Sequence, residues 1–226
     1  MTRTRFGLLV LAIGVCAFAA TLLTRRFNAP ALDDHRQVRQ LILYYTLSRA
    51  DDPIVVLGDS IVEASTLPRS LCGHPVVNAG LNGASTASDL GNWLALALAS
   101  KRASTIIVSL GTNDALVQAP VSKQAFEDRY AALLSELAKL TKHLFVLGIP
   151  PVETRGRMTA DMQKEALATI DTFNSVLPGL AQRFNAAFLA LPPMPSLHTI
   201  DGVHLNSEGY RVWDKTITEG ASASCD

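Results

Sequence analysis

The residues best suited to chemistry are Ser60, Asp201 and His204, which could supply a nucleophile, an orienting acid and a base. A serine hydroxyl is a poor nucleophile until a base removes its proton, and the usual base is a histidine oriented by a carboxylate. In Asp201-Gly202-Val203-His204 the glycine lets the chain fold so that Asp201 can reach the imidazole. These residues indicate acyl transfer. An ordinary turn at Ser60 and a coincidental Asp and His in a surface loop are the alternatives.

Acyl transfer also needs hydrogen-bond donors directed at the oxyanion that develops on the substrate. The backbone N–H of Ser60 is one candidate. Gly80 follows a predicted strand and has no side chain to block approach to its own N–H, and Asn113 offers a side-chain amide. A tight turn at Gly80 and a helix cap or Asx turn at Asn113 are the structural alternatives.

A metal site is a weaker interpretation of the same region. Asp201, His204 and His198 could supply ligands, but no second closely spaced pair of ligands supports them. We therefore expect no metal ion and no cofactor.

The strands that position these residues alternate with helices. The stretch 54–57 is apolar throughout and reads as a strand buried on both faces, ending in Gly58-Asp59-Ser60. The predicted strands are 54–57, 76–79, 105–110, 144–149 and 187–191, and the predicted helices are 33–50, 61–65, 85–100, 120–143, 159–184 and 207–219. Alternation of this kind predicts an α/β fold with a doubly wound parallel sheet of about five strands. Its short loops would bring the polar clusters to one edge of the sheet.

The bulk composition excludes several classes of function. The 226 residues are 48% hydrophobic and 18% charged, which is not typical of a disordered or nucleic-acid-binding chain. Lysine plus arginine equals aspartate plus glutamate at 20 each, so no overall field would attract a polyanion.

The first segment has a different character from the rest. Arg3 and Arg5 precede an apolar run at 6–23, which Arg25 follows. The run is long enough for a membrane anchor, and Ala17-Phe18-Ala19 resembles a signal-peptide cleavage site. We predict a signal peptide or transmembrane anchor at 1–24, a linker and leading helix at 25–52, and a hydrolase domain at 53–226. Either reading of 1–24 predicts a periplasmic or other extracytoplasmic protein, secreted or held by a single N-terminal apolar helix in the membrane.

The cysteines fit that location. Cys16 lies in the apolar run, which leaves Cys72 and Cys225 free to form a disulfide bond in an oxidising compartment. The pairing is a hypothesis at this point.

Four polar blocks together resemble one family. Gly58-Asp59-Ser60, Asn78-Ala79-Gly80, Gly111-Thr112-Asn113-Asp114 and Asp201-Gly202-Val203-His204-Leu205 are similar, in order and spacing, to the four blocks of SGNH (GDSL-type) hydrolases. The resemblance implies a flavodoxin-like, three-layer α/β/α fold and hydrolysis of esters or thioesters without a metal. It implies Ser60 as nucleophile, His204 as base and Asp201 as orienting acid. The implied oxyanion hole is the N–H of Ser60, the N–H of Gly80 and the side chain of Asn113.

The residues after Ser60 bear on the substrate. Ile61-Val62-Glu63 is more similar to the carbohydrate-esterase and acetylhydrolase branches than to the thioesterase branch. The expected substrate is therefore a short acyl ester, such as an acetyl group, on a glycan or similar molecule. A lysophospholipase or acyl thioesterase is the alternative, suggested by the apolar loop at 191–195. A catalytically inactive glycan-binding domain is a third, and the complete set of site residues argues against it.

Overall fold

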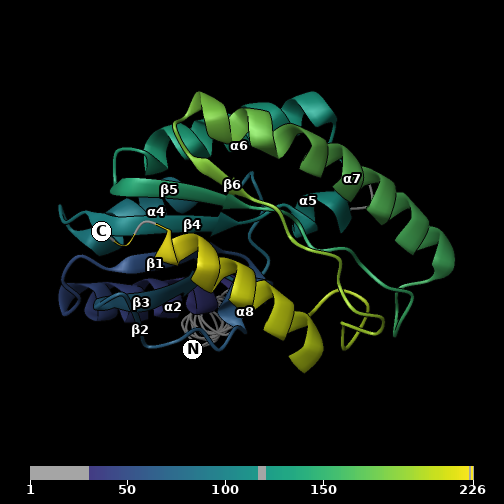
Figure 1. Ribbon diagram of the computed structural model, residues 1–226, viewed down its shortest axis with the longest axis horizontal. Helices are drawn as coiled ribbons and strands as arrows, with labels where there is room; N and C mark the ends of the chain where they lie inside the picture. Colours follow the sequence, from purple (N-terminus) through teal and green to yellow (C-terminus); the bar gives the residue numbers. More distant parts are fainter. Residues whose placement is uncertain (1–30, 117–120, 224, 226) are drawn as a thin grey trace, which may run out of the picture. The chain divides into compact units, whose positions relative to one another are not determined.

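The computed structural model describes residues 31–116, 121–223 and 225, and its centre is a six-stranded sheet with helices on both faces (Figure 1). The strands are β1 (Ile54–Gly58), β2 (Ser70–Leu71), β3 (His74–Gly80), β4 (Ala103–Ser109), β5 (Thr141–Leu147) and β6 (Ala187–Leu189). Their order is β2-β3-β1-β4-β5-β6, and every neighbouring pair is parallel except β2 and β3. The predicted α/β fold and its five parallel strands are confirmed.

The sixth strand, β2, was not predicted. It forms a short antiparallel hairpin with β3 through a two-residue turn at Cys72 and Gly73, both of which have positive φ. A turn of this kind requires left-handed backbone at both central residues, and cysteine is not a usual residue there. The sequence therefore carried no clear signal for the hairpin.

The helices cover the two faces of the sheet. They are α2 (Ala31–Ser48), α3 (Ser60–Glu63), α4 (Leu90–Leu98), α5 (Thr112–Leu116), α6 (Lys123–Leu137), α7 (Ala160–Arg183) and α8 (Ser207–Ser222). The prediction for α6 was too long at its C-terminal end, because residues 141–143 already belong to β5. The short helix α5 replaces a predicted loop and carries Asn113.

Alternate residues of the central strand face different layers. Val55 and Leu57 are buried in one cluster with side chains of α2, α4, α6 and α7. Ile54 and Val56 are buried in the other cluster, with Trp213 of α8 and residues of α3. Figure 1 shows α6 and α7 on one side of the sheet and α8 on the other. The fold is thus a three-layer α/β/α arrangement, and both faces of β1 are buried as its unbroken apolar sequence predicts.

The chain divides after Arg39 into two units, and the whole sheet belongs to the second. The predicted apolar helix and the signal peptide or anchor at 1–24 lie outside the described residues, so the predicted domain boundaries remain predictions. Within the part of the chain that is described, no helix is both long and apolar enough to cross a membrane.

A disulfide bond joins Cys72 to Cys225, so the pairing predicted from the sequence is present. Their Cα atoms are 5.9 Å apart across a sequence separation of 153 residues. The bond ties the β2–β3 hairpin to the chain after α8. Cross-linking so long a loop removes much conformational freedom from the unfolded chain.

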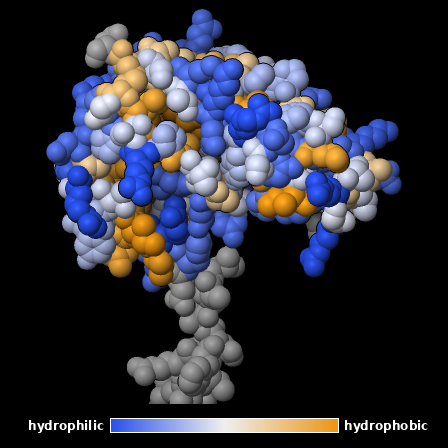
Figure 2. Space-filling model, turned by 60° about the horizontal axis from the view of Figure 1, so that its bottom comes forward, coloured by the Kyte–Doolittle hydropathy of each residue, from blue (hydrophilic) through white to orange (hydrophobic). Residues whose placement is uncertain are grey.

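The surface in Figure 2 shows apolar areas separated by hydrophilic side chains. The most exposed large apolar side chains of the sheet unit outside α2 are Leu96, Met162, Leu197 and Ile200. Leu197 and Ile200 belong to the segment between β6 and α8 that also carries Asp201 and His204.

Candidate active site

Ser60 lies at the carboxyl end of β1, as the first residue of α3. Asp59 caps this helix, because its side chain accepts a hydrogen bond from the N–H of Ile61 at 2.9 Å. Gly58 allows the close approach of β4, since a Cβ atom there would lie 2.1 Å from the carbonyl oxygen of Ser109. Ser60 is thereby presented, partly exposed, at the edge where ligands bind in open α/β sheets.

The structure brings His204 and Asp201 to Ser60. The hydroxyl of Ser60 lies 3.0 Å from Nε2 of His204, and Nδ1 of His204 lies 2.7 Å from Oδ2 of Asp201. The other carboxylate oxygen of Asp201 accepts the backbone N–H groups of Val203 and His204, at 3.0 and 2.8 Å. With Nδ1–H donated to Asp201, Nε2 is left to accept the proton of Ser60, which is the arrangement that serine activation requires.

Asp201 is held in its ionised form. Burial alone would raise its pKa, but hydrogen bonds from the side chain and backbone of His204 and the backbone of Val203 outweigh that effect and lower the pKa to about 2. Asp201 therefore carries a full negative charge at neutral pH. That charge fixes the orientation of the imidazole. It also stabilises the imidazolium ion that forms when His204 accepts a proton.

The loop that carries Asp201 is held by Glu153, which the sequence did not single out, and by Arg155. Glu153 Oε2 accepts hydrogen bonds from the N–H and hydroxyl of Thr199, at 2.8 and 2.7 Å. The N–H of Glu153 donates to the carbonyl of Gly202 at 2.8 Å, and Arg155 donates to the carbonyl of Thr199 at the same distance. Burial raises the pKa of Glu153, but the hydrogen bonds from Thr199 and the neighbouring His198 together outweigh that effect, so the pKa is lowered overall. Only the structure shows that the loop after β5 supports this segment.

Asn113 lies on α5, directly after β4. One hydrogen of its side-chain amide is donated to the carbonyl of Ala84 at 2.8 Å, which leaves the second N–H of the same nitrogen for another acceptor. The next residue, Asp114, is buried and accepts hydrogen bonds from the N–H and hydroxyl of Thr86. Burial raises the pKa of Asp114. Helix α5 thus holds the loop that follows β3.

The structure does not place the Gly80 N–H with the other predicted oxyanion donors. That N–H donates to Oδ1 of Asn78 at 2.9 Å. A Cβ atom at Gly80 would lie 2.1 Å from the backbone nitrogen of Glu63, so glycine is needed here for α3 to pack on β3. The sequence analysis expected the missing side chain to leave the N–H of Gly80 open to the substrate, whereas in the structure it leaves room for helix α3.

Gly83 is the glycine whose N–H is available in this loop. It is exposed and has a φ of +74° in a turn closed by the N–H of Ala84 and the carbonyl of Leu81, at 3.0 Å. A turn with positive φ at its third residue favours glycine there. Within the described residues, the N–H of Gly83 donates to no acceptor. The Asn82-Gly83 pair, typical of turns, was the signal in the sequence that could have identified it.

A second carboxyl group lies beneath Ser60. Burial raises the pKa of Asp59 to about 7, although the hydrogen bond from Ile61 and the nearby His204 lower it in part. The side chain is 2% exposed. The fold therefore favours the protonated form of this carboxyl group.

His198 does not join Asp201 and His204. Its ring nitrogens lie 2.9 Å from the carbonyl of Pro195 and 3.0 Å from that of Pro151, and Nδ1 is 3.1 Å from Glu153. Across residues 31–116, 121–223 and 225, no group of three or more His, Cys, Asp or Glu side chains could hold a metal ion. His198 instead braces the loop between β6 and α8.

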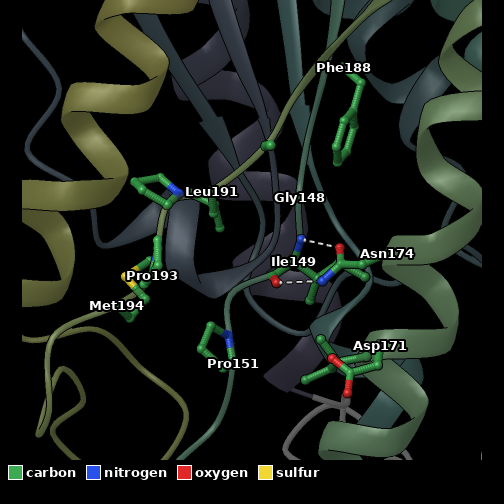
Figure 3. A pocket seen from close by; sticks show the side chains of 12 residues that line it. Gly148, Ile149, Pro151, Asp171, Asn174, Phe188, Leu191, Pro193 and Met194 are labelled. Atoms are coloured by element: carbon green, nitrogen blue, oxygen red, sulfur yellow. Dashed lines mark hydrogen bonds between the residues drawn. The ribbon is translucent and has the colours of Figure 1, made fainter.

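Two pockets lie near the carboxyl ends of the strands. One, of about 500 Å³, includes Asp201 in its wall and is otherwise lined by Leu116, Gly156, Arg157, Met158, Met162 and Val203. The other, of about 440 Å³, lies between α7 and the ends of β5 and β6 (Figure 3). In its wall the side chain of Asn174 bonds both the N–H and the carbonyl of Ile149, at 2.8 and 3.0 Å. None of the described residues that line this second pocket belongs to the Ser60–His204–Asp201 set, so the first is the pocket beside the chemistry.

Solved structures share this fold. A Streptococcus pneumonia structure whose description names platelet activating factor is 25% identical, with a TM-score of 0.67, and the match covers 90% of this chain and 98% of that one. A lipase/acylhydrolase from Enterococcus faecalis is 18% identical (TM-score 0.61; 76% and 96% covered). Axe2, an acetylxylan esterase from Geobacillus stearothermophilus, is 17% identical (TM-score 0.56; 76% and 94% covered). A search of curated protein sequences found no match.

The family is settled by a match over most of the chain. Residues 56–212 match the model of the GDSL-like lipase/acylhydrolase family. The matched range begins inside β1 and ends inside α8, so it contains Ser60, Asn113, Asp201 and His204. The chain belongs to the GDSL-like lipase/acylhydrolase family of SGNH-type esterases.

Proposed function

We propose that this esterase removes short acyl groups, such as acetyl, from a carbohydrate or a similar ester, with Ser60 as its nucleophile. The observation that carries the mechanism is the continuous hydrogen-bonded series from Ser60 through His204 to Asp201. The series contains the three groups that serine-based acyl transfer needs, each within hydrogen-bonding distance of the next.

The reaction then proceeds in two halves. Oγ of Ser60 attacks the ester carbonyl while Nε2 of His204 takes its proton, and the tetrahedral intermediate collapses as His204 gives that proton to the departing alcohol. Water next attacks the acyl-enzyme, His204 takes a proton from the water, and the carboxylic acid leaves as Ser60 regains its hydrogen. Asp201 stays ionised throughout and stabilises the imidazolium form of His204.

Three donors would stabilise the oxyanion. We assign them to the N–H of Ser60, the N–H of Gly83 and the second amide hydrogen of Asn113. Gly83 replaces Gly80 because the N–H of Gly80 is donated to Asn78. Asn113 lies beside the turn that contains Gly83, because its side chain donates a hydrogen bond to the carbonyl of Ala84, the residue after Gly83.

Two observations bear on the substrate. The Ile61-Val62-Glu63 sequence and the fold shared with an acetylxylan esterase support a short acyl group on a glycan. The pocket beside Asp201, with Leu116, Met158 and Met162 in its wall, favours a second candidate, a lysophospholipase or thioesterase that binds a longer acyl chain. The complete Ser60–His204–Asp201 series argues against an inactive glycan-binding domain.

A chain-length series separates the two candidates. Purified protein would be assayed on p-nitrophenyl acetate, butyrate, octanoate and palmitate, and on acetylated xylo-oligosaccharides and lysophosphatidylcholine. We expect kcat/KM to be highest for p-nitrophenyl acetate and to fall with acyl chain length. We also expect acetate to be released from the oligosaccharides. A maximum at octanoate or longer, with lysophosphatidylcholine hydrolysed, would instead establish the lipid-ester candidate.

We also propose that the protein works outside the cytoplasm. The basic and apolar pattern of residues 1–24 supports export, and a disulfide bond between Cys72 and Cys225 suits an oxidising compartment. Cell fractionation followed by mass spectrometry of the N-terminus would test both export and cleavage. Recovery in the cytoplasm with an intact N-terminus and free thiols would reject the proposal.

A further inference from the structure

We infer that Glu63 is a positioning residue for catalysis, which holds the Asn82-Gly83 turn so that the N–H of Gly83 faces the oxyanion. The inference rests on the proposed function and on the assignment of Gly83 within it. Glu63 itself does not touch the reacting atoms in this account. It acts through the backbone of the turn.

The contact that carries the inference joins the carboxylate of Glu63 to the backbone of Asn82. Oε2 of Glu63 accepts the N–H of Asn82 at 2.6 Å. A charged acceptor makes this bond shorter and stronger than one between neutral groups. Asn82 directly precedes Gly83, so the bond fixes the Leu81–Asn82 peptide unit, which is the one immediately before the unit whose N–H belongs to Gly83.

Glu63 shares a single helical turn with the nucleophile. Helix α3 begins at Ser60 and ends at Glu63, and the N–H of Glu63 donates to the carbonyl of Asp59 at 2.9 Å. The backbone of Glu63 is therefore tied to that of Ser60. A group held by Glu63 keeps a constant relation to the nucleophile.

The end of α3 is also fastened to β3. The side-chain amide of Asn78 donates to the carbonyl of Val62 at 2.6 Å, and the backbone of Glu63 packs against Gly80 with no room for a Cβ atom between them. The helix cannot shift without disturbing the strand that leads into the turn. The backbone of Glu63 is therefore held in a fixed position relative to β3.

The other side of Gly83 is held from a different element. Asn113 of α5 donates to the carbonyl of Ala84 at 2.8 Å. Gly83 thus lies between Asn82, which is bound by Glu63 of α3, and Ala84, which is bound by Asn113 of α5. Gly83 is exposed, and a Cβ atom added to it would meet nothing within 4 Å. Packing therefore does little to hold Gly83 itself, and hydrogen bonds hold the turn around it. The N–H of Leu81 donates to the carbonyl of Gly58 and the N–H of Ala84 to the carbonyl of Leu81, both at 3.0 Å, and Glu63 adds the bond to the N–H of Asn82 between them.

Three variants test the role of Glu63. Glu63→Ala removes the acceptor, Glu63→Gln keeps an oxygen that can accept the Asn82 N–H, and Glu165→Ala removes an exposed carboxylate on α7 as a matched control. For p-nitrophenyl acetate we expect Glu63→Ala to lower kcat roughly tenfold or more. This is smaller than the loss of roughly 10²–10³ expected when an oxyanion donor itself is removed. KM should change less than threefold. Glu63→Gln should stay within threefold of the wild type in both parameters, and Glu165→Ala should be unchanged.

A tetrahedral inhibitor gives a second, independent reading. A phenylboronic acid that forms an adduct with Ser60 places an oxygen where the oxyanion would lie, so its affinity should fall in Glu63→Ala in parallel with kcat. Melting temperatures measured alongside show whether each variant is folded. A merely structural role would lower the melting temperature but leave the kcat and the boronate affinity of the folded fraction unchanged.

Two results would overturn the inference. One is wild-type kcat and boronate affinity in folded Glu63→Ala. The other is an equal loss in Glu63→Ala and Glu63→Gln with a raised KM, which would mean that the charge acts on substrate binding. Either result is compatible with an active wild type and an inactive Ser60→Ala, so failure of this inference is distinct from failure of the proposed function.

Discussion

Nε2 of His204 lies 3.0 Å from the hydroxyl of Ser60 although 144 residues separate them in the chain. The strand β1 and the cap at Asp59 deliver the serine, and the loop between β6 and α8 delivers the histidine. The strand is buried on both faces, and the loop is held by hydrogen bonds with Glu153 and Arg155. The arrangement therefore exists before substrate binds, and binding needs to supply little of the energy that orients these two groups.

Replacing Asn113 by alanine should lower kcat for p-nitrophenyl acetate by roughly 10²–10³, the cost measured for other side-chain oxyanion donors. Removing the Asn113 side chain also removes its hydrogen bond to the carbonyl of Ala84, which helps to hold the turn at Gly83. Steady-state kinetics on folded protein would measure the loss in kcat, with Asn92→Ala on the exposed surface of α4 as the control. A loss below threefold would mean that Asn113 serves only to bind Ala84.

Gly80 and Gly83 should respond differently to alanine. At Gly80 the new Cβ atom would lie 2.1 Å from the backbone nitrogen of Glu63, so either α3 or β3 must move. We expect a large fall in melting temperature for Gly80→Ala. At Gly83 the space is open and only the positive φ is strained, a cost of roughly 1–2 kcal/mol.

Thermal unfolding of the two variants side by side is the measurement. Equal melting temperatures would show that Gly80 is not needed for the packing of α3, and would reopen its assignment as an oxyanion donor.

Asp59 should make the fold less stable as pH rises. Burial raises its folded-state pKa to about 7 from the ordinary 3.8, so the fold favours the protonated form. The stabilising contribution is complete below pH 3.8 and is lost as pH rises from there through about 7, by about 1.4 kcal/mol for each pKa unit of separation. Asn at this position can still cap α3 but cannot ionise.

The check is urea unfolding of wild type and Asp59→Asn at intervals between pH 4 and 8. The stability of the variant relative to the wild type should increase across this range. Asp201 does not interfere, because its lowered pKa affects stability only as pH falls from 3.8 toward 2. Parallel pH profiles for the two proteins would contradict the account of Asp59.

Loss of the disulfide bond should destabilise the fold without altering the chemistry. Cys72→Ser/Cys225→Ser is expected to lower the free energy of unfolding by roughly 2–5 kcal/mol, because the unfolded chain regains the freedom that a long cross-linked loop denies it. The kcat for p-nitrophenyl acetate should be unchanged below the melting temperature. Urea unfolding of the wild type with and without reductant provides the control, and no difference between these two conditions would contradict the prediction.

The sequence predicted the parts of the site that local patterns encode. Unbroken apolar strands ending in polar blocks gave the parallel sheet, and the spacing in Asp201-Gly202-Val203-His204 gave a carboxylate within reach of an imidazole. The structure confirms the sheet and places Ser60, Asp201 and His204 together; their catalytic roles remain predictions.

What the sequence could not give depends on contacts between distant segments. Gly80 was assigned from its place after a strand, but the packing of α3 on β3 determines where its N–H points. Glu153 supports the Asp201 loop through its hydrogen bond with Thr199, a residue 46 positions away in the chain. Helix α5 escaped prediction because five residues are too few for a helical repeat to be visible.

The role of Ser60 as nucleophile is tested most directly by the reaction of the wild type and Ser60→Ala with p-nitrophenyl acetate and a fluorophosphonate. We predict that the wild type turns over the ester and acquires one phosphonyl adduct, located at Ser60 by peptide mass mapping. Ser60→Ala, with an unchanged melting temperature, should do neither. Unchanged turnover in Ser60→Ala, or an adduct on another residue, would contradict the assignment of Ser60 as the nucleophile.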